Sequence, residues 1–90
     1  MYVWDEAKNR RNQIKHAVSF EEAQTVFEDP TAIIASNQNG SEEVRAIIIG
    51  YSRKSRQLFV VFFEEDDDET IRIISARKLT RADKKSLGWL

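Results

Sequence analysis

The spacing of hydrophobic residues changes near residue 30, which divides the chain into a helical part and a strand-forming part. In the first part, a helix is predicted to begin at Asp5, a favourable N-cap residue, and to run to about Lys15. A second helix starts at the capping box Ser19-x-x-Glu22 and continues through residues at helical spacing: Phe20, Ala23, Val26 and Phe27. It ends at Asp29-Pro30, because proline disfavours the α conformation in the residue before it.

The rest of the chain predicts four β-strands joined by short links. Apolar and alternating segments place these strands at about residues 31–37, 44–51, 57–64 and 70–76. Asn39-Gly40 is a strong hairpin signal, and the acidic run of residues 64–69 closes the last hairpin. The third strand is apolar on both faces, so we expect it at the centre of the sheet with both faces covered. Helices can cover one face, and the other needs the last helix, a partner or both.

Together these elements predict a single domain, residues 1–90, of the α+β class. Two N-terminal helices pack on a four-stranded antiparallel sheet, and a C-terminal helix runs from the shortened capping box Thr80-x-x-Asp83 to about Leu87. A short additional strand near Tyr2 is left open. A chain of this length buries roughly 60–65% of its unfolded surface, which is enough for one small core.

The first helix carries a thin apolar stripe of Trp4, Ala7, Ile14 and the stem of Arg11, and a broader basic stripe. The basic stripe lies on one face and consists of Lys8, Asn12, Lys15 and His16. His16 is the only histidine, and an imidazole titrates near neutral pH, so it is a candidate for proton transfer. The alternatives are a structural role for His16 and a plainly solvated face for the lysines.

Composition restricts the classes of protein further. The chain has no cysteine, which excludes disulfides, thiolate metal sites and a cysteine nucleophile. It has no apolar run of about 20 residues and no signal-peptide pattern, so we expect a cytoplasmic protein without membrane contact. The formal net charge is −1, and because residues 64–69 are six consecutive acids, the remainder carries +5. A sum near zero therefore does not exclude a nucleic-acid partner.

Positive charge concentrates in residues 71–85, which contain six basic residues and one acid. Strict strand alternation places Arg72 and Ile74 on one face and Ile73 and Ser75 on the other. Arg77 and Lys78 follow at the end of this strand, and Arg81 opens the last helix. Arginine pairs with phosphate through two parallel hydrogen bonds, so the stretch predicts a phosphate-binding surface. Pairing with nearby acids at a solvated face is the alternative.

Two other charged features have less specific interpretations. Arg45, in an otherwise apolar strand, faces either a groove or plain solvent. The acidic run lacks the alternating ligands and the glycine of a calcium loop, so it is interpreted as a solvated hairpin tip. With one histidine and no cysteine, no metal site is expected.

The order of these motifs resembles the BrnT family of toxins. The opening resembles it in Trp4-Asp5-x-x-Lys8-x-x-x-Asn12-x-x-Lys15-His16-x-Val18-Ser19-Phe20-x-Glu22-Ala23, and Phe27-x-Asp29-Pro30 continues the match. Arg45 with Gly50 is similar to the family's second-strand pattern, and Ile71-Arg72-Ile73-Ile74-Ser75-Ala76-Arg77-Lys78 to its closing signature. The resemblance covers nearly the whole chain.

The resemblance implies a RelE-like fold and a ribonuclease of a type II toxin–antitoxin system that inhibits translation. A ribbon-helix-helix antitoxin would neutralise it, and operator DNA would be bound only through that complex. RNA cleavage would need no metal or other cofactor, because the 2′-hydroxyl attacks the adjacent phosphate. Arg72, Arg77 and Lys78 would hold this phosphate, and His16 or Lys15 would transfer the proton. Further contacts to RNA would come from Lys8, Arg11, Arg45, Arg81 and Lys84.

The chain departs from the family pattern at three positions. Ala17 stands where relatives have glycine after the histidine, and Asp83 and Leu87 stand at the positions of a glutamate and a tyrosine. A catalytically weakened or inactive module that binds an antitoxin and co-represses its own operon is therefore the main alternative. A third interpretation is an α+β domain whose basic face is only solvated.

Overall fold

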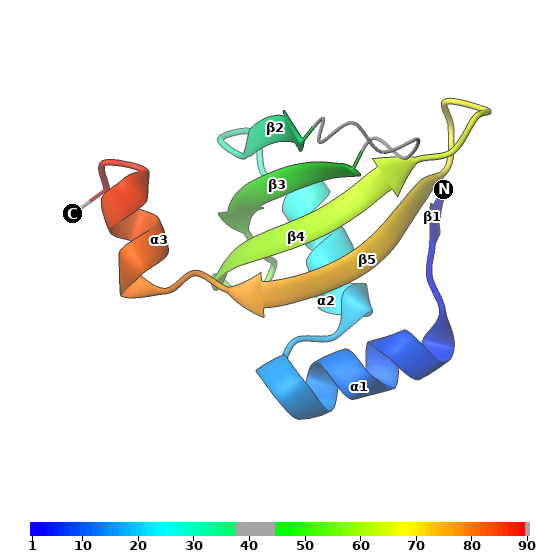
Figure 1. Cartoon of the computed structure of the whole chain (residues 1–90), viewed down its shortest axis with the longest axis horizontal. Coiled ribbons are helices and arrows are strands. Elements are labelled where there is room, and N and C mark those ends of the chain that lie inside the picture. The colour runs from blue at the N-terminus through cyan, green and yellow to red at the C-terminus, as the bar shows by residue number, and fades with distance from the viewer. Residues whose placement is uncertain (38–44, 90) are drawn as a thin grey trace.

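The computed structural model describes residues 1–37 and 45–89 and has the predicted α+β class (Figure 1). In chain order its elements are β1 (Tyr2–Val3), α1 (Glu6–His16), α2 (Phe20–Gln24), the 3-10 helix η1 (Thr25–Glu28), β2 (Ile33–Asn37), β3 (Arg45–Tyr51), β4 (Gln57–Glu64), β5 (Ile71–Lys78) and α3 (Arg81–Ser86). The hairpin signal at Asn39-Gly40 lies outside the described residues.

The sheet has five strands in the order β1-β5-β4-β3-β2, not the four that we predicted as its main body. The short strand near Tyr2 is real, and it runs parallel to β5 with Tyr2 opposite Ile71. The other neighbours are antiparallel, as expected. The Ile71 amide donates to the Met1 carbonyl at 2.8 Å, so β1 continues the hydrogen bonding of the sheet at this edge.

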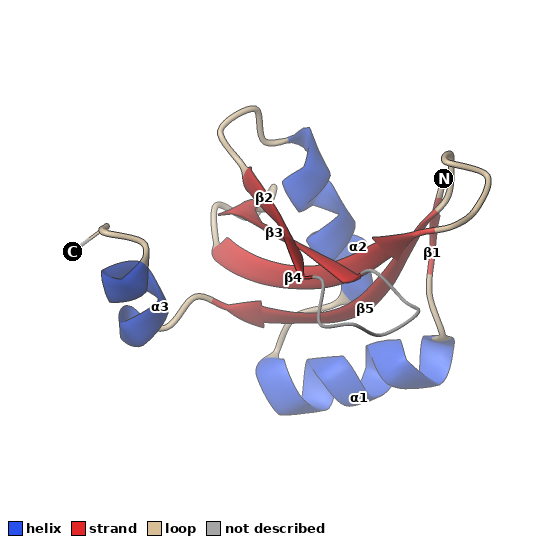
Figure 2. Cartoon of the chain, turned by 45° about the horizontal axis from the view of Figure 1, so that its top comes forward, coloured by secondary structure: helices blue, strands red, loops and turns tan. Residues whose placement is uncertain are grey.

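The core lies on one face of the sheet, which α2 and η1 cover, whereas α1 lies alongside β5 at the edge (Figures 1 and 2). Val18, in the link between α1 and α2, and Phe20, Ala23 and Val26 of α2 and η1 are buried together with six strand residues: Ile48, Leu58, Val60, Phe62, Ile73 and Ala76. The last helix does not cover the second face of β4, which was one of the two covers that we predicted; cover by a partner stays a prediction. The last helix, α3, lies beyond the end of β5 and not across the sheet (Figure 1), so Phe59, Val61 and Phe63 form a half-buried open face. No helix in the described part of the chain is long and apolar enough to span a membrane.

Helix α1 is attached mainly through asparagines, and of the predicted apolar stripe Trp4, just before the helix, packs against the core. Ile14 is 87% exposed, whereas Asn9 and Asn12 are buried. The Asn12 amide donates to the carbonyls of Val18 and Ala76 at 2.8 Å, and its oxygen accepts from the Ala76 amide at 3.2 Å. The helix lies along β5 beyond the end of β1, where strand backbone groups need hydrogen-bond partners more than apolar cover.

A register shift corrects the predicted alternation in β5. Ile73 pairs with Phe62, but Ser75 pairs with Val61, so an extra residue is inserted at Ile74. Paired residues share a face, and Ser75 therefore lies on the open face and not beside Ile73. The same bulge turns Arg77, which pairs with Phe59, onto the face of Arg72.

The capping box of α2 forms only in part. The Ser19 hydroxyl accepts from the Glu22 amide at 3.0 Å, as predicted. The Glu22 carboxylate instead accepts from the Ser52 hydroxyl at 2.6 Å and from the Arg56 guanidinium, both in the β3–β4 turn. These hydrogen bonds, the Arg56 bonds above all, hold the pKa of Glu22 below its ordinary value. This buried glutamate thus fastens the turn to α2 and does not cap the helix.

Candidate functional site

A groove between α1 and β5 gathers the basic stripe of the first helix. The groove has a volume of about 300 Å³ and is lined by Lys8, Arg11, Asn12, Lys15, His16, Ile74 and Ser75. The helical spacing of these residues places them on one side of α1, and Asn12 fixes that side against β5. The β5 bulge supplies the opposite wall through Ile74 and Ser75. The structure therefore brings together four of the predicted site residues.

The cations of this groove are not neutralised by salt bridges in the described part of the chain, although the charge of Asp5 attracts Lys8 and Arg11. Among the described residues, Lys8, Arg11 and Lys15 form no ion pair, and all three are exposed, whereas His16 is half-buried. Lys15 and His16 lie in the last turn of α1, where the helix dipole favours positive charge. Three cations, an imidazole and the Ser75 hydroxyl can together hold an anion and move a proton.

Arg72 and Arg77, by contrast, are already paired within the chain. Arg72 Nε donates to Glu65 Oε1 at 2.8 Å. Arg77 donates to both carboxylate oxygens of Asp83, at 2.5 and 3.2 Å, and its guanidinium lies 4.3 Å from the centre of the Phe59 ring. Both arginines lie on the open face, but five residues of strand, roughly 15 Å, separate them. They do not converge on one phosphate.

Asp83 both caps a helix and pairs with an arginine, two roles that the sequence analysis considered separately. It completes the predicted capping box with Thr80, and it is also the partner of Arg77. The Arg77 hydrogen bond, followed by that of the Thr80 amide, holds the pKa of Asp83 far below its usual range. The shorter aspartate therefore ties the start of α3 to the end of β5.

The remaining predicted residues lie outside the groove. Lys78 is exposed at the end of β5, Arg81 is exposed in the first turn of α3, and Lys84 is half-buried in that helix. Arg45 is exposed at the start of β3 and, by alternation with Ile47, belongs to the open face. These residues surround the sheet without forming one cluster with His16.

Two residues of the groove escaped the sequence analysis as site residues. Asn12 was counted in the polar stripe, but an asparagine within a helix is itself a signal of a side-chain hydrogen bond. Strict alternation predicted Ser75 on the face of Ile73, because no local sequence pattern indicates a bulge. Both lie where the α1 cations meet the sheet.

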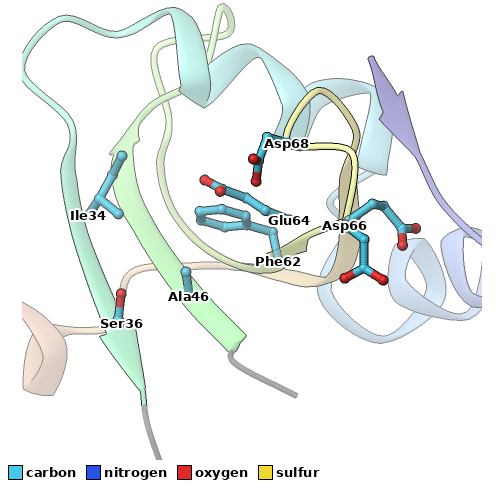
Figure 3. A pocket seen from close by; sticks show the side chains of 8 residues that line it. Ile34, Ser36, Ala46, Phe62, Glu64, Asp66 and Asp68 are labelled. Atoms are coloured by element: carbon cyan, nitrogen blue, oxygen red, sulfur yellow. The ribbon is translucent and has the colours of Figure 1, made fainter. Parts of the chain in front are cut away.

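A second cavity, of about 380 Å³, opens on the helix side of the sheet at the acidic tip (Figure 3). Its lining comprises Ile34, Ser36, Ala46, Phe62, Glu64, Glu65, Asp66 and Asp68. The described residues contain no group of three or more histidine, aspartate or glutamate side chains arranged to hold a metal ion. The acidic tip, which we predicted to be only solvated, therefore also lines one side of this cavity.

The sequence and the fold were compared with known proteins, and both match the BrnT family. Residues 4–83 match the family described as "Ribonuclease toxin, BrnT, of type II toxin-antitoxin system". The fold matches the 1.1 Å crystal structure of the Brucella abortus ribonuclease toxin BrnT with a TM-score of 0.70 and 23% identity, over 90% of this chain and 99% of that chain. No curated protein sequence matches the chain. Because the family match spans most of its length, the chain belongs to the BrnT family of ribonuclease toxins of type II toxin–antitoxin systems.

Proposed function

We propose that this protein is an active endoribonuclease toxin that cleaves RNA without a metal ion and thereby inhibits translation in the cytoplasm. A ribbon-helix-helix antitoxin neutralises it, and the pair binds operator DNA through the antitoxin. The observation that carries the proposal is the groove between α1 and β5. There, three cations that form no salt bridge with the described residues lie beside His16, the one histidine of the sequence, in a chain of a toxin family.

The chemistry of the groove supports the cleavage step. His16 or Lys15 removes the proton of a ribose 2′-hydroxyl, and the resulting oxygen attacks the adjacent phosphorus. The bond from phosphorus to the 5′-oxygen breaks, and a protonated groove side chain gives that oxygen a proton. Lys8 and Arg11, with Lys15 when His16 is the base, stabilise the negative charge that develops on the phosphate. The products are a 2′,3′-cyclic phosphate and a 5′-hydroxyl end.

Arg72, Arg77 and Lys78 extend this surface along β5. Ser75 lies between the two arginines on the open face and also lines the groove, so a bound strand can pass from α1 across β5. In this arrangement Arg77 contacts a phosphate beside the scissile one, and Arg45, Arg81 and Lys84 contact more distant phosphates.

The test is incubation of the purified chain with end-labelled RNA in the presence of a chelator. We expect cleavage that leaves cyclic or 3′-phosphate ends. His16→Ala and Arg77→Ala should fold and lose most of this cleavage, whereas Arg10→Ala should keep it. Arg10 is a matched control because it is exposed on α1 but does not line the groove. Ends carrying a 5′-phosphate, or activity that depends on added metal, would contradict the mechanism.

A non-catalytic binding module remains the second candidate, and a specific observation favours it. Leu87 replaces the family's tyrosine, and Asp83 engages the guanidinium of Arg77. The same RNA assay distinguishes the two functions. Absence of cleavage together with tight binding of the antitoxin, encoded by the neighbouring reading frame, would establish the co-repressor.

A further inference from the structure

Strand β2 is the edge strand of the sheet opposite β1. Among the described residues it pairs with β3 alone, and its sequence, Ile33-Ile34-Ala35-Ser36-Asn37, contains no charge and no proline. Ile33 is 43% exposed and Ile34 is 62% exposed. Sheet edges of monomeric proteins are usually blocked by lysine, proline or a bulge, because free backbone groups recruit further strands. An apolar edge without these features is suited to receive one.

The cavity at the acidic tip lies directly beside this edge (Figure 3). Ile34 and Ser36, two residues apart, present side chains from β2 to the cavity, and Ala46 and Phe62 continue its floor across β3 and β4. Glu64, Asp66 and Asp68 border the far side. The cavity therefore has an apolar floor that begins at the free edge and ends at a row of carboxylates.

The negative charge at this border of the cavity indicates which kind of segment can pair with β2. Glu65 is paired with Arg72, but Glu64, Asp66 and Asp68 form no ion pair among the described residues. A second copy of the chain paired along β2 would bring an identical acidic border close to the first, and like charges would oppose the contact. A segment with positive side chains satisfies the border and the apolar floor together.

We propose that β2 accepts an extended segment of the antitoxin as a sixth strand, with lysine or arginine at alternate positions. This strand would lie about 14 Å from β4, three strand spacings away. A lysine or arginine of this strand lays its apolar stem over Ile34 and directs its charge across the cavity toward the carboxylates, whose own side chains extend to meet it. Backbone hydrogen bonds supply the pairing, and the alternate cations fix its register. The inference rests on the proposed function only in identifying the partner as the antitoxin.

The direct test uses a synthetic probe and the full chain labelled with ¹⁵N. The probe is an eight-residue peptide of alternating valine and lysine, and its control replaces each lysine with glutamate. We expect the lysine peptide to shift the amide signals of β2 and of the cavity, and to bind at least tenfold more tightly than the control. Equal binding of the two peptides, or shifts confined to the α1 groove, would overturn the proposal.

Variants extend the test to the antitoxin complex. Ile34→Lys should weaken both peptide and antitoxin at least tenfold, and Asp66→Asn with Asp68→Asn should also reduce the salt dependence of binding. Ile14→Lys is the matched control, because Ile14 is an equally apolar, 87% exposed residue on α1. An antitoxin complex indifferent to Ile34→Lys, or a chain dimer that this variant dissociates, would overturn the proposal. RNA cleavage is measured separately, so an inactive chain that still binds through β2 contradicts only the proposed ribonuclease.

Discussion

The arginines at positions 56, 72 and 77 differ from the cations of α1 in what surrounds their charged groups. Each of these arginines donates to a carboxylate: Arg56 to Glu22, Arg72 to Glu65 and Arg77 to Asp83. Lys8, Arg11 and Lys15 share one helix face and have no such partner among the described residues. The two sets of positive side chains therefore differ in whether a carboxylate of the same chain neutralises their charge.

The difference teaches that local density of basic residues does not by itself identify a phosphate site. Residues 71–85 are the stretch with the most positive charge in the sequence. Of its two strand arginines, Arg72 pairs with Glu65 of the tip and Arg77 pairs with Asp83 of α3. Helix α1, whose positive charge is less concentrated in the sequence, leaves its cations available to bind phosphate. Removing a carboxylate partner of the paired arginines should therefore affect mainly folding stability, whereas removing the α1 cations should affect mainly RNA binding.

The largest expected effect concerns the most buried pair. Glu22→Ala should lower the free energy of unfolding by about 3 kcal/mol, because it leaves Arg56 without its buried partner. The Glu22 side chain is 3% exposed and that of Arg56 is 30% exposed. Denaturant unfolding measures the loss, and Glu28→Ala, which breaks the exposed pair with Arg53, should change stability by less than about 1 kcal/mol. Equal effects of the two variants would contradict the importance of burial.

The α1 set is tested by removing all three of its exposed cations. Lys8→Ala, Arg11→Ala and Lys15→Ala combined should weaken RNA binding by about 100-fold, which corresponds to about 2.7 kcal/mol. Release of fewer counterions should also reduce the slope of log affinity against log salt by about 2. Thermal unfolding should change little. A triple variant that loses stability but keeps its RNA affinity would reverse the comparison.

Much of this fold follows from local signals in the sequence. The N-caps Asp5, Ser19 and Thr80 accept the backbone hydrogen bonds that their positions predicted. The four longer strands lie within two residues of the predicted bounds, because alternation and turn residues are local properties. The attachment of α1 was not predictable in this way. It depends on Asn12 meeting Ala76, which is 64 residues distant in the chain.

The residues of the candidate site could be predicted from the sequence, but the ion pairs of its arginines and the face on which each lies could not. The helical period placed Lys8, Lys15 and His16 together, and the structure confirms that grouping. Which cations are paired depends on contacts such as Arg72 with Glu65, formed only when the tip folds over β5. The face of Arg77 depends on the bulge opposite Val61 and Phe62, which strict alternation does not reveal.

A smaller effect is expected from Asp83→Asn, which weakens the pair with Arg77. Loss of charge at the carboxylate should lower the free energy of unfolding by about 1 kcal/mol at pH 7. Because the pKa of Asp83 is lowered in the folded state, its contribution is present above the unfolded pKa near 3.9 and disappears as pH falls through the lower folded value. Stability curves of the variant and the parent should therefore converge in acid. A difference that persists undiminished at pH 2 would exclude this origin.

The smallest effect is expected at the exposed pair of Arg72 and Glu65, and its sign for RNA is informative. Their side chains are 41% and 28% exposed, so Glu65→Gln should change stability by only about 0.5 kcal/mol. The same change releases the Arg72 guanidinium and removes a negative charge. If Arg72 contacts phosphate in the RNA complex, affinity should rise about threefold, and this gain should vanish when Arg72→Ala is added. A gain that survives in the double variant would come from the altered charge of the tip, and Arg72 would then belong with the structural arginines alone.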